Sequence, residues 1–171
     1  MDLKAYIRNV DDFPKKGIIF REISPLTGNK DCLSYATKEM ARPFLDARVD
    51  IVVGMESRGF IFGSVIAYHL GAGFMMIRKA GKLPPPTYRV PFQTTYGSGE
   101  LELPRNALHK GQRILIVDDV LAAGGTTRSV QKLLSNYEVE IVGAAYLIEL
   151  VFLKGRDTLG AMEVHSLIQY S

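Results

Sequence analysis

The sequence has one cysteine, three histidines and no tryptophan among its 171 residues. A single cysteine, Cys32, excludes an intramolecular disulfide and any zinc site built from several cysteines. Three histidines are too few for most metal clusters. The amino end shows no signal-peptide pattern, and we therefore expect a cytoplasmic protein.

Long uncharged runs are also scarce. Residues 59–77 contain no Asp, Glu, Lys or Arg and reach the length of a membrane span. Gly71, Ala72 and Gly73 interrupt this run. The pattern predicts a buried helix over 59–70 followed by a buried strand over 74–77, so we expect no membrane partner.

The surplus of positive charge is small and uneven. Twenty-one Lys and Arg oppose 18 Asp and Glu, a net charge of +3, which is far below that of a nucleic-acid coat. Residues 54–90 hold five basic residues against one acid, a net +4, which leaves the remainder at −1. With no basic stripe interleaved with aromatic residues, we expect a small polyanionic ligand and no nucleic acid.

Hydrophobic periodicity predicts helices that alternate with strands. Helical spacing predicts helices over 2–10, 31–45 (broken late by Pro43) and 126–136, and apolar runs predict strands over 49–54, 113–117 and 139–150. This order is typical of an α/β fold with a mainly parallel central sheet flanked by helices. The length fits one domain, residues 1–171.

Residues 78–99 show little periodicity and contain four prolines and several glycines. A loop of about twenty residues is unusual in a compact domain, and such loops are commonly lids or binding loops. The basic residues at its start favour those roles. A tolerated surface insertion is the alternative.

The most informative segment is ILIVDDVLAAGGTT, residues 114–127. Its apolar run ends in Asp118 and Asp119, at the strand end where open α/β sheets bind ligands. Gly124 and Gly125 allow close backbone approach, and the following helix presents free amides to a phosphate. The carboxylates would accept hydrogen bonds from ribose hydroxyls or hold a hydrated Mg²⁺, so the pattern predicts a sugar-phosphate site. An ordinary strand-end turn is the alternative.

This segment resembles the phosphoribosyl pyrophosphate signature of the type I phosphoribosyltransferases. Three further segments resemble the adenine phosphoribosyltransferase family, and the likeness covers nearly the whole chain in the right order. They are residues 13–26 (FPKKGIIFREISPL), 54–60 (GMESRGF) and 78–84 (RKAGKLP). The resemblance implies the type I fold, with a small N-terminal hood segment and a long flexible loop.

The resemblance also implies an activity. It is that of a pentosyltransferase of purine salvage, which transfers the phosphoribosyl group of phosphoribosyl pyrophosphate to adenine and releases AMP and pyrophosphate. Mg²⁺ would be bound through the substrate, with no direct protein ligand. A homodimer is implied, in which the base of the long loop contacts the neighbouring site. In the transition state, positive charge would develop on the ribose ring and negative charge on the leaving pyrophosphate. Anions near the ring and cations at the leaving group would therefore speed the reaction.

Site residues follow from the resemblance, position by position. The catalytic set is Asp118 and Asp119, which would hold the ribose diol, with Arg58 and the loop tyrosine Tyr96. The 5′-phosphate would be held by Ala122, Ala123, Gly124, Gly125 and Thr126. Pyrophosphate would be bound by Glu56, Ser57, Arg58, Arg78, Lys79 and Lys82. Phe20 and Arg21 would bind the base, with Phe20 packed on the purine face; Phe20 as a plain core residue is the alternative.

Two positions depart from the family pattern. Thr95 stands where the family has a glutamate that assists proton movement, a contribution worth about 10² to 10⁴ in rate. Ala123 replaces a threonine, at a cost of roughly tenfold to hundredfold in phosphate binding. Two alternatives follow from these departures. One is a catalytically weak paralogue that binds nucleotide or serves as a regulatory subunit of a mixed dimer, and the other is transfer to another 6-substituted purine.

Overall fold

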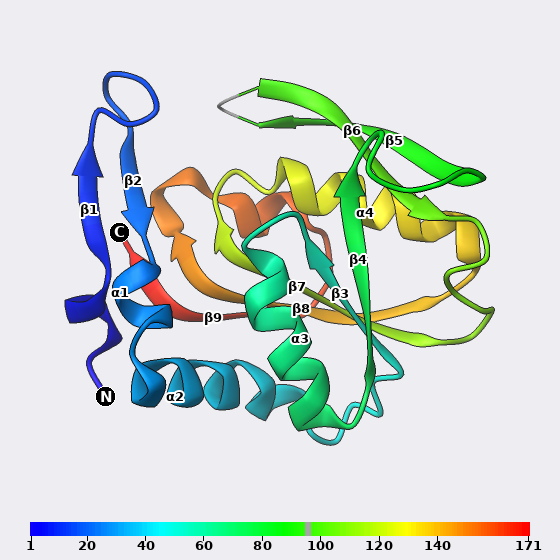
Figure 1. Cartoon of the computed structure of the whole chain (residues 1–171), viewed down its shortest axis with the longest axis horizontal. Coiled ribbons are helices and arrows are strands. Elements are labelled where there is room, and N and C mark those ends of the chain that lie inside the picture. The colour runs from blue at the N-terminus through cyan, green and yellow to red at the C-terminus, as the bar shows by residue number, and fades with distance from the viewer. Residues whose placement is uncertain (95–96) are drawn as a thin grey trace.

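The computed structural model describes residues 1–94 and 97–171, and within them it contains a seven-stranded sheet (Figure 1). The strand order is β5-β6-β4-β3-β7-β8-β9. The parallel strands are β3 (Ile51–Met55), β4 (Gly73–Lys79), β7 (Arg113–Leu121), β8 (Glu140–Leu150) and β9 (Val164–Tyr170). Antiparallel strands β6 (Gly97–Pro104) and β5 (Thr87–Thr94) extend one edge. The predicted mainly parallel α/β fold is confirmed.

Helices cover both faces of this sheet. Helices α2 (Lys30–Ala41) and α3 (Gly59–Leu70) pack on one face, and α4 (Gly125–Leu134) packs on the other. Side chains alternate along β7, so that Leu115 and Val117 join the first core and Ile114 and Ile116 join the second. A parallel strand buried on both faces carries a continuous apolar run, which is the pattern that predicted β7.

The helix boundaries follow local signals. Asn29 caps α2 by accepting hydrogen bonds from the amides of Asp31 and Cys32, and Pro43 falls in the 3₁₀ helix η2 (Arg42–Phe44) that follows α2. Gly71 ends α3 in the left-handed conformation, with φ +64°. Among the described residues, no helix is both long and apolar enough to cross a membrane.

The N-terminal segment differs from its prediction. A 3₁₀ helix, η1 (Leu3–Tyr6), replaces the first part of the expected helix, and strand β1 (Arg8–Asp11) replaces the rest. Strand β1 pairs antiparallel with β2 (Ile19–Glu22), and the short helix α1 (Ser24–Thr27) follows. The helical spacing of apolar residues was misleading because pairing with β2, across the intervening residues 12–18, decides the conformation here. We call residues 3–27 the hood.

The prediction of a loop over residues 78–99 was wrong for most of that range. Strand β4 continues to Lys79, and β5 and β6 form a hairpin whose register pairs Val90 with Leu101. Both of these side chains are buried in the core beside α4, which is why the segment is extended despite Pro91. Pro91 faces Glu100 in this register and lacks an amide proton to donate.

Short 3₁₀ helices lie in the connections on either side of β8. Helix α4 leads through the 3₁₀ helix η3 (Ser135–Tyr137) to β8. Two further 3₁₀ helices, η4 (Val151–Leu153) and η5 (Gly155–Thr158), then connect β8 to β9. Both lie at the carboxyl end of β8, on the same side of the sheet as the end of β7.

We predict that Phe44→Ala lowers the free energy of unfolding by about 3–5 kcal/mol. Phe44 is 1% exposed and packs against Gly143 of β8, so its loss leaves a cavity beneath the sheet. Its neighbour Leu45 is 61% exposed and provides the control. Leu45→Ala should change stability by less than about 0.5 kcal/mol in the same urea titration. Equal effects of the two variants would contradict this assignment of the core.

Candidate active site

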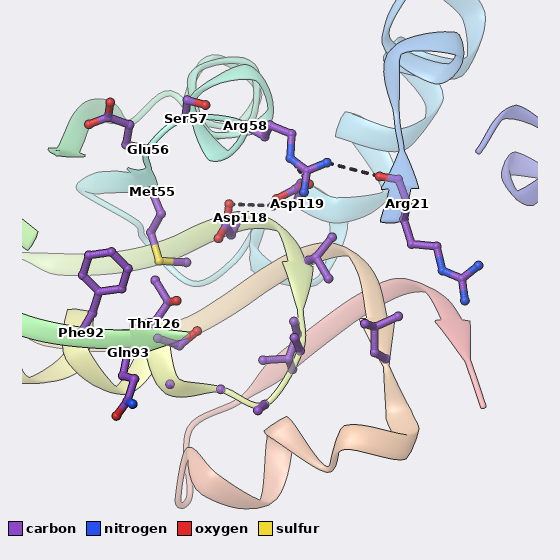
Figure 2. A pocket seen from close by; sticks show the side chains of 18 of the residues that line it. Arg21, Met55, Glu56, Ser57, Arg58, Phe92, Gln93, Asp118, Asp119 and Thr126 are labelled. Atoms are coloured by element: carbon purple, nitrogen blue, oxygen red, sulfur yellow. Dashed lines mark hydrogen bonds and ion pairs between the residues drawn. The ribbon is translucent and has the colours of Figure 1, made fainter. Parts of the chain in front are cut away.

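A cavity of about 520 Å³ opens at the carboxyl ends of β3 and β7 (Figure 2). Its walls come from the hood, from the turn between β3 and α3, from the β5–β6 hairpin, and from the β7–α4 connection. The lining residues are Ile19, Phe20, Arg21, Met55, Glu56, Ser57, Arg58, Lys79, Phe92, Gln93, Leu101, residues 118–127 and Leu150. Elements far apart in sequence therefore meet at the predicted edge of the sheet.

Asp118 and Asp119 lie within β7, not after it as the apolar run suggested. Strand β3 pairs with β7 only as far as Val117, whereas β8 pairs with β7 as far as Leu121. Beyond Val117 one side of β7 is thus free of its neighbour β3, and the two carboxylates stand at that opening.

Glycines bring α3 close to these carboxylates. A Cβ on Gly59 would lie 2.9 Å from Asp118 Oδ1, and a Cβ on Gly54 would lie 2.9 Å from the Gly59 carbonyl oxygen. A methyl group at either position would push α3 off the sheet. This close approach places Arg58, which directly precedes α3, above the end of β7.

Arg58 joins the carboxylates to the hood. Its Nε lies 2.8 Å from Asp119 Oδ2 in an ion pair, and its Nη1 donates to the Arg21 carbonyl oxygen at 3.2 Å (Figure 2). Asp119 is buried, and its Oδ2 accepts no hydrogen bond from the described residues beyond this ion pair. Asp118 Oδ1 accepts from the Asp119 amide at 2.9 Å. Two carboxyl groups and one guanidinium are thus held together at the cavity wall.

Burial raises the pKa of both carboxyls, because the charged form loses its hydration. The pKa of Asp118 lies well above its usual range, since the negative charge of Asp119 adds to the effect of burial. The Arg58 guanidinium opposes the rise in the pKa of Asp119. Negative charge is therefore concentrated at Asp119, where it is paired.

The phosphate-binding segment predicted from Ala122, Ala123, Gly124, Gly125 and Thr126 lines the cavity in full. Gly124 precedes α4 in the left-handed conformation, with φ +80°, and as a glycine it has no side chain to cap the helix. The first amides of α4 are therefore free to bind an anion. The Thr127 hydroxyl, in contrast, lies 2.7 Å from Tyr146 Oη inside the core.

The predicted pyrophosphate residues separate into two groups. Glu56, Ser57, Arg58 and Lys79 line the cavity, whereas Arg78 and Lys82 are not among the residues found to line it. Glu56 Oε2 accepts from Arg78 Nε at 3.0 Å and from the Lys79 amide at 2.8 Å. Burial opposes ionisation of Glu56, but these hydrogen bonds and the adjacent positive charges outweigh it and lower its pKa. Glu56 thus fixes the end of β4 beside the cavity.

The positive charge of residues 54–90 is less available than the sequence indicated. Arg58 pairs with Asp119, Arg78 with Glu56, and Arg89 with Glu102. Two of these acids lie outside the stretch, and only the fold brings them to it. Of these three arginines only Arg58 lines the cavity, so a bound polyanion meets an arginine that is already held in place.

The two hood residues are placed differently. Phe20 lines the cavity, with the Arg58 guanidinium 4.8 Å from its ring centre. The Arg21 side chain points away from Asp118 and Asp119 (Figure 2). Its guanidinium lies 3.9 Å from the ring centre of Tyr170. Only the backbone of Arg21 is therefore positioned to meet a ligand, and its carbonyl already accepts from Arg58.

Several lining residues were missed by sequence reasoning. Phe92 and Gln93 belong to β5, which the lack of periodicity concealed, although alternation of Tyr88, Val90 and Phe92 was available as a strand signal. Met55 at the end of β3 also lines the cavity. The predicted loop residues Thr95 and Tyr96 lie outside the described part of the chain.

Within residues 1–94 and 97–171, no group of three or more His, Cys, Asp or Glu side chains is arranged to hold a metal ion. Asp118 and Asp119 supply carboxylate oxygens, the donor type that Mg²⁺ prefers, but two adjacent acids do not complete a coordination shell. The residues present fit a Mg²⁺ that is coordinated by substrate oxygens and water, with the two carboxylates near its water ligands.

Comparison with known proteins agrees with this geometry. A family model described as the phosphoribosyl transferase domain matches residues 31–159. An adenine phosphoribosyltransferase of Clostridium botulinum (strain Eklund 17B / Type B) is 49% identical over 170 residues, which cover 99% of each chain.

Solved structures show the same relationship. The adenine phosphoribosyltransferase of Rhodothermus marinus DSM 4252 has a TM-score of 0.92 at 44% identity, over 98% of this chain and 96% of its own. The adenine phosphoribosyltransferase of Saccharomyces cerevisiae, complexed with an imino-altritol bisphosphate and adenine, has a TM-score of 0.89 at 35% identity. The match covers 97% of this chain and 96% of the yeast chain. The chain therefore belongs to the phosphoribosyltransferase family, within which these relatives are adenine phosphoribosyltransferases.

Proposed function

We propose that this protein transfers the phosphoribosyl group of phosphoribosyl pyrophosphate to adenine, producing AMP and pyrophosphate. The observation that supports this best is the wall formed by residues 118–127, where two carboxylates and a free helix N-terminus line one cavity. Their separation along the chain matches a sugar whose hydroxyls and 5′-phosphate must be bound together. The printed names of the relatives supply adenine as the base.

The substrate orientation follows from the site. The 5′-phosphate binds the amides at the start of α4, and the ribose hydroxyls donate to Asp118 and Asp119. The pyrophosphate lies toward Ser57, Arg58 and Lys79, at the ends of β3 and β4. The purine packs on Phe20, within reach of the backbone of the hood.

Catalysis is then mainly electrostatic. As the bond from the anomeric carbon to pyrophosphate breaks, positive charge grows on the ribose ring beside the ionised Asp119, and negative charge grows on the leaving group beside Arg58 and Lys79. These groups lie in a partly buried site, where fixed charges act more strongly than in water. Arg58 is held in place by Asp119 and by the Arg21 carbonyl, so little reorganisation is needed.

We propose Mg²⁺ as the cofactor, carried by the substrate. Asp118 and Asp119 are the residues that would contact its water ligands. When bound, Mg²⁺ neutralises charge on the pyrophosphate and makes it a better leaving group.

We further propose that residues 1–171 act as one domain and pair in a homodimer. The hydrogen bond from Arg58 to the Arg21 carbonyl supports the first part, because it ties the hood to the cavity. Exposed apolar side chains on α3 and β4 support the second, namely Ile61, Tyr68 and Met76. A cytoplasmic location stays a prediction from the low cysteine content.

The proposed function predicts a base preference that a substrate panel measures. Purified protein with phosphoribosyl pyrophosphate and Mg²⁺ should form AMP from adenine, identified by mass. Its kcat/KM for adenine should exceed that for hypoxanthine, guanine or xanthine by at least about 100-fold, because a site that hydrogen-bonds one purine edge leaves groups unpaired with the others. Replacing Mg²⁺ by EDTA should stop turnover.

Three outcomes of the panel would reject the proposal. Preference for another purine would move the activity to that base. No product at high enzyme concentration would remove the activity altogether. AMP binding without turnover, with activity restored by the double variant T95E/A123T, would identify the weak paralogue.

Asp118→Asn should raise stability while it lowers activity. Because the folded-state pKa of Asp118 is raised, its ionisation costs free energy in the folded state at pH 7, and a neutral side chain removes that cost. The gain should shrink as the pH falls through the raised pKa and vanish below the ordinary pKa of aspartate. Losing an acceptor of a ribose hydroxyl should lower kcat/KM about tenfold, equivalent to about 1.4 kcal/mol.

Urea unfolding at several pH values measures the first effect, and initial rates measure the second. The exposed Asp46 is the matched control, and Asp46→Asn should alter neither. A less stable Asp118→Asn protein at pH 7 would contradict the assigned burial cost.

The dimer proposal predicts the mass in solution. Sedimentation equilibrium should give about 38 kDa, twice the 19.0 kDa of the chain. The double variant I61E/M76E should shift the protein toward the monomer, since two charges would be buried in the interface. Phe152→Glu, on the exposed surface of η4, should leave the dimer intact. A wild-type monomer at micromolar concentration would reject the proposal.

A further inference from the structure

A second segment supports the phosphate-binding loop from behind. Residues 155–158, the 3₁₀ helix η5, pack directly against residues 122–124. A Cβ on Gly155 would overlap the Ala122 carbonyl and approach the Gly124 amide nitrogen at 3.1 Å. A Cβ on Gly124 would overlap Thr158 Oγ1. The two segments meet backbone to backbone, so the loop can keep its shape only while η5 keeps its position.

The position of η5 is set by one guanidinium. Arg156 Nε and Nη2 donate to the two carboxylate oxygens of Glu149 at 3.1 and 2.6 Å. Its Nη1 donates to the Val164 carbonyl at 2.5 Å, and its Nη2 also donates to Ser166 Oγ at 3.2 Å. This bidentate arrangement attaches η5 to β8 and β9 simultaneously.

The anchor lies next to the loop that it would support. Glu149 is buried on β8, and in the sheet register it faces Leu121, the residue before Ala122. Hydrogen bonds from Arg156 and Ser166 lower the pKa of Glu149 in spite of its burial, so the carboxylate stays ionised at neutral pH. Among the described residues that line the cavity, Leu150 is included but Glu149 and Arg156 are not.

We propose that Glu149 and Arg156 are positioning residues for the 5′-phosphate: they hold η5 against residues 122–124 and so keep the loop amides aimed at the phosphate. This inference rests on the proposed function, since it assigns the phosphate to that loop. It differs from a purely structural role, in which the ion pair would stabilise the fold without any selective effect on one substrate.

A matched pair of arginine variants separates the two roles. Arg113, at the opposite end of β7, also pairs with a glutamate of β8, Glu140, and donates Nε to a backbone carbonyl. Its side chain is 35% exposed, against 42% for Arg156. A lysine at either site keeps the charge; at position 156 it also loses the bidentate contact with the glutamate, whereas Arg113 reaches Glu140 through Nη1 alone.

Arg156→Lys should raise the KM for phosphoribosyl pyrophosphate about tenfold, equivalent to about 1.4 kcal/mol, and leave the KM for adenine within about twofold. Arg113→Lys should leave both KM values within about twofold, even where it lowers the melting temperature as much as Arg156→Lys. Equal effects of the two variants, or an equal rise in both KM values for Arg156→Lys, would overturn the proposal.

Gly155→Ala tests the same contact without touching the ion pair. Gly155 does not require a positive φ, so the methyl adds only its overlap with the Ala122 carbonyl. We expect the same selective rise in the KM for phosphoribosyl pyrophosphate, and an unchanged KM would overturn the proposal. Calorimetry with ribose 5-phosphate keeps the test independent of turnover. Weaker binding of ribose 5-phosphate by Arg156→Lys and Gly155→Ala supports the positioning role even if no purine is a substrate. Wild-type affinity in these two variants rejects it.

Discussion

The ion pair between Arg58 and Asp119 is the contact on which the rest of the site depends. It joins the turn before α3 to β7, and the second hydrogen bond of Arg58 reaches the hood. Three parts of the chain are thereby fixed around one cavity. A buried carboxylate needs such a partner, because an unpaired charge would cost several kcal/mol in this environment. The ion pair in turn requires glycine at position 59, since any side chain there would hold α3 away from β7.

Electrostatics and packing divide the work at this cavity. One wall carries two adjacent carboxyls, Asp118 and Asp119, and the pKa of Asp118 is raised. Beside them lies Arg58, which forms an ion pair with Asp119. The opposite wall is supported from behind, because η5 packs against the loop before α4 and Arg156 binds η5 to the sheet. Such an arrangement keeps free amides and an ionised acid pointing at a ligand before it arrives. Preorganisation of this kind is what electrostatic catalysis requires.

Sequence reasoning was most accurate where one physical signal dominated. The apolar run predicted the start of β7, although that strand continues to Leu121, and the glycine after α3 predicted the end of that helix. It was wrong in the hood and over residues 78–99, where pairing with a distant strand outweighed local spacing. The contribution of Phe92 and Gln93 to the cavity was missed for the same reason, since a strand that was not recognised cannot be placed beside α4.

The sequence by itself determined the α/β class and the family resemblance, and it supplied the order of acids, glycines and threonines after β7. These depend on neighbours in the chain, whose spacing is visible in the sequence. Only the tertiary structure decided which charges are available. It paired three arginines of residues 54–90 with acids, turned the Arg21 side chain toward Tyr170, and set η5 behind the phosphate loop. Those outcomes depend on contacts between distant residues, which the fold creates and local sequence does not encode.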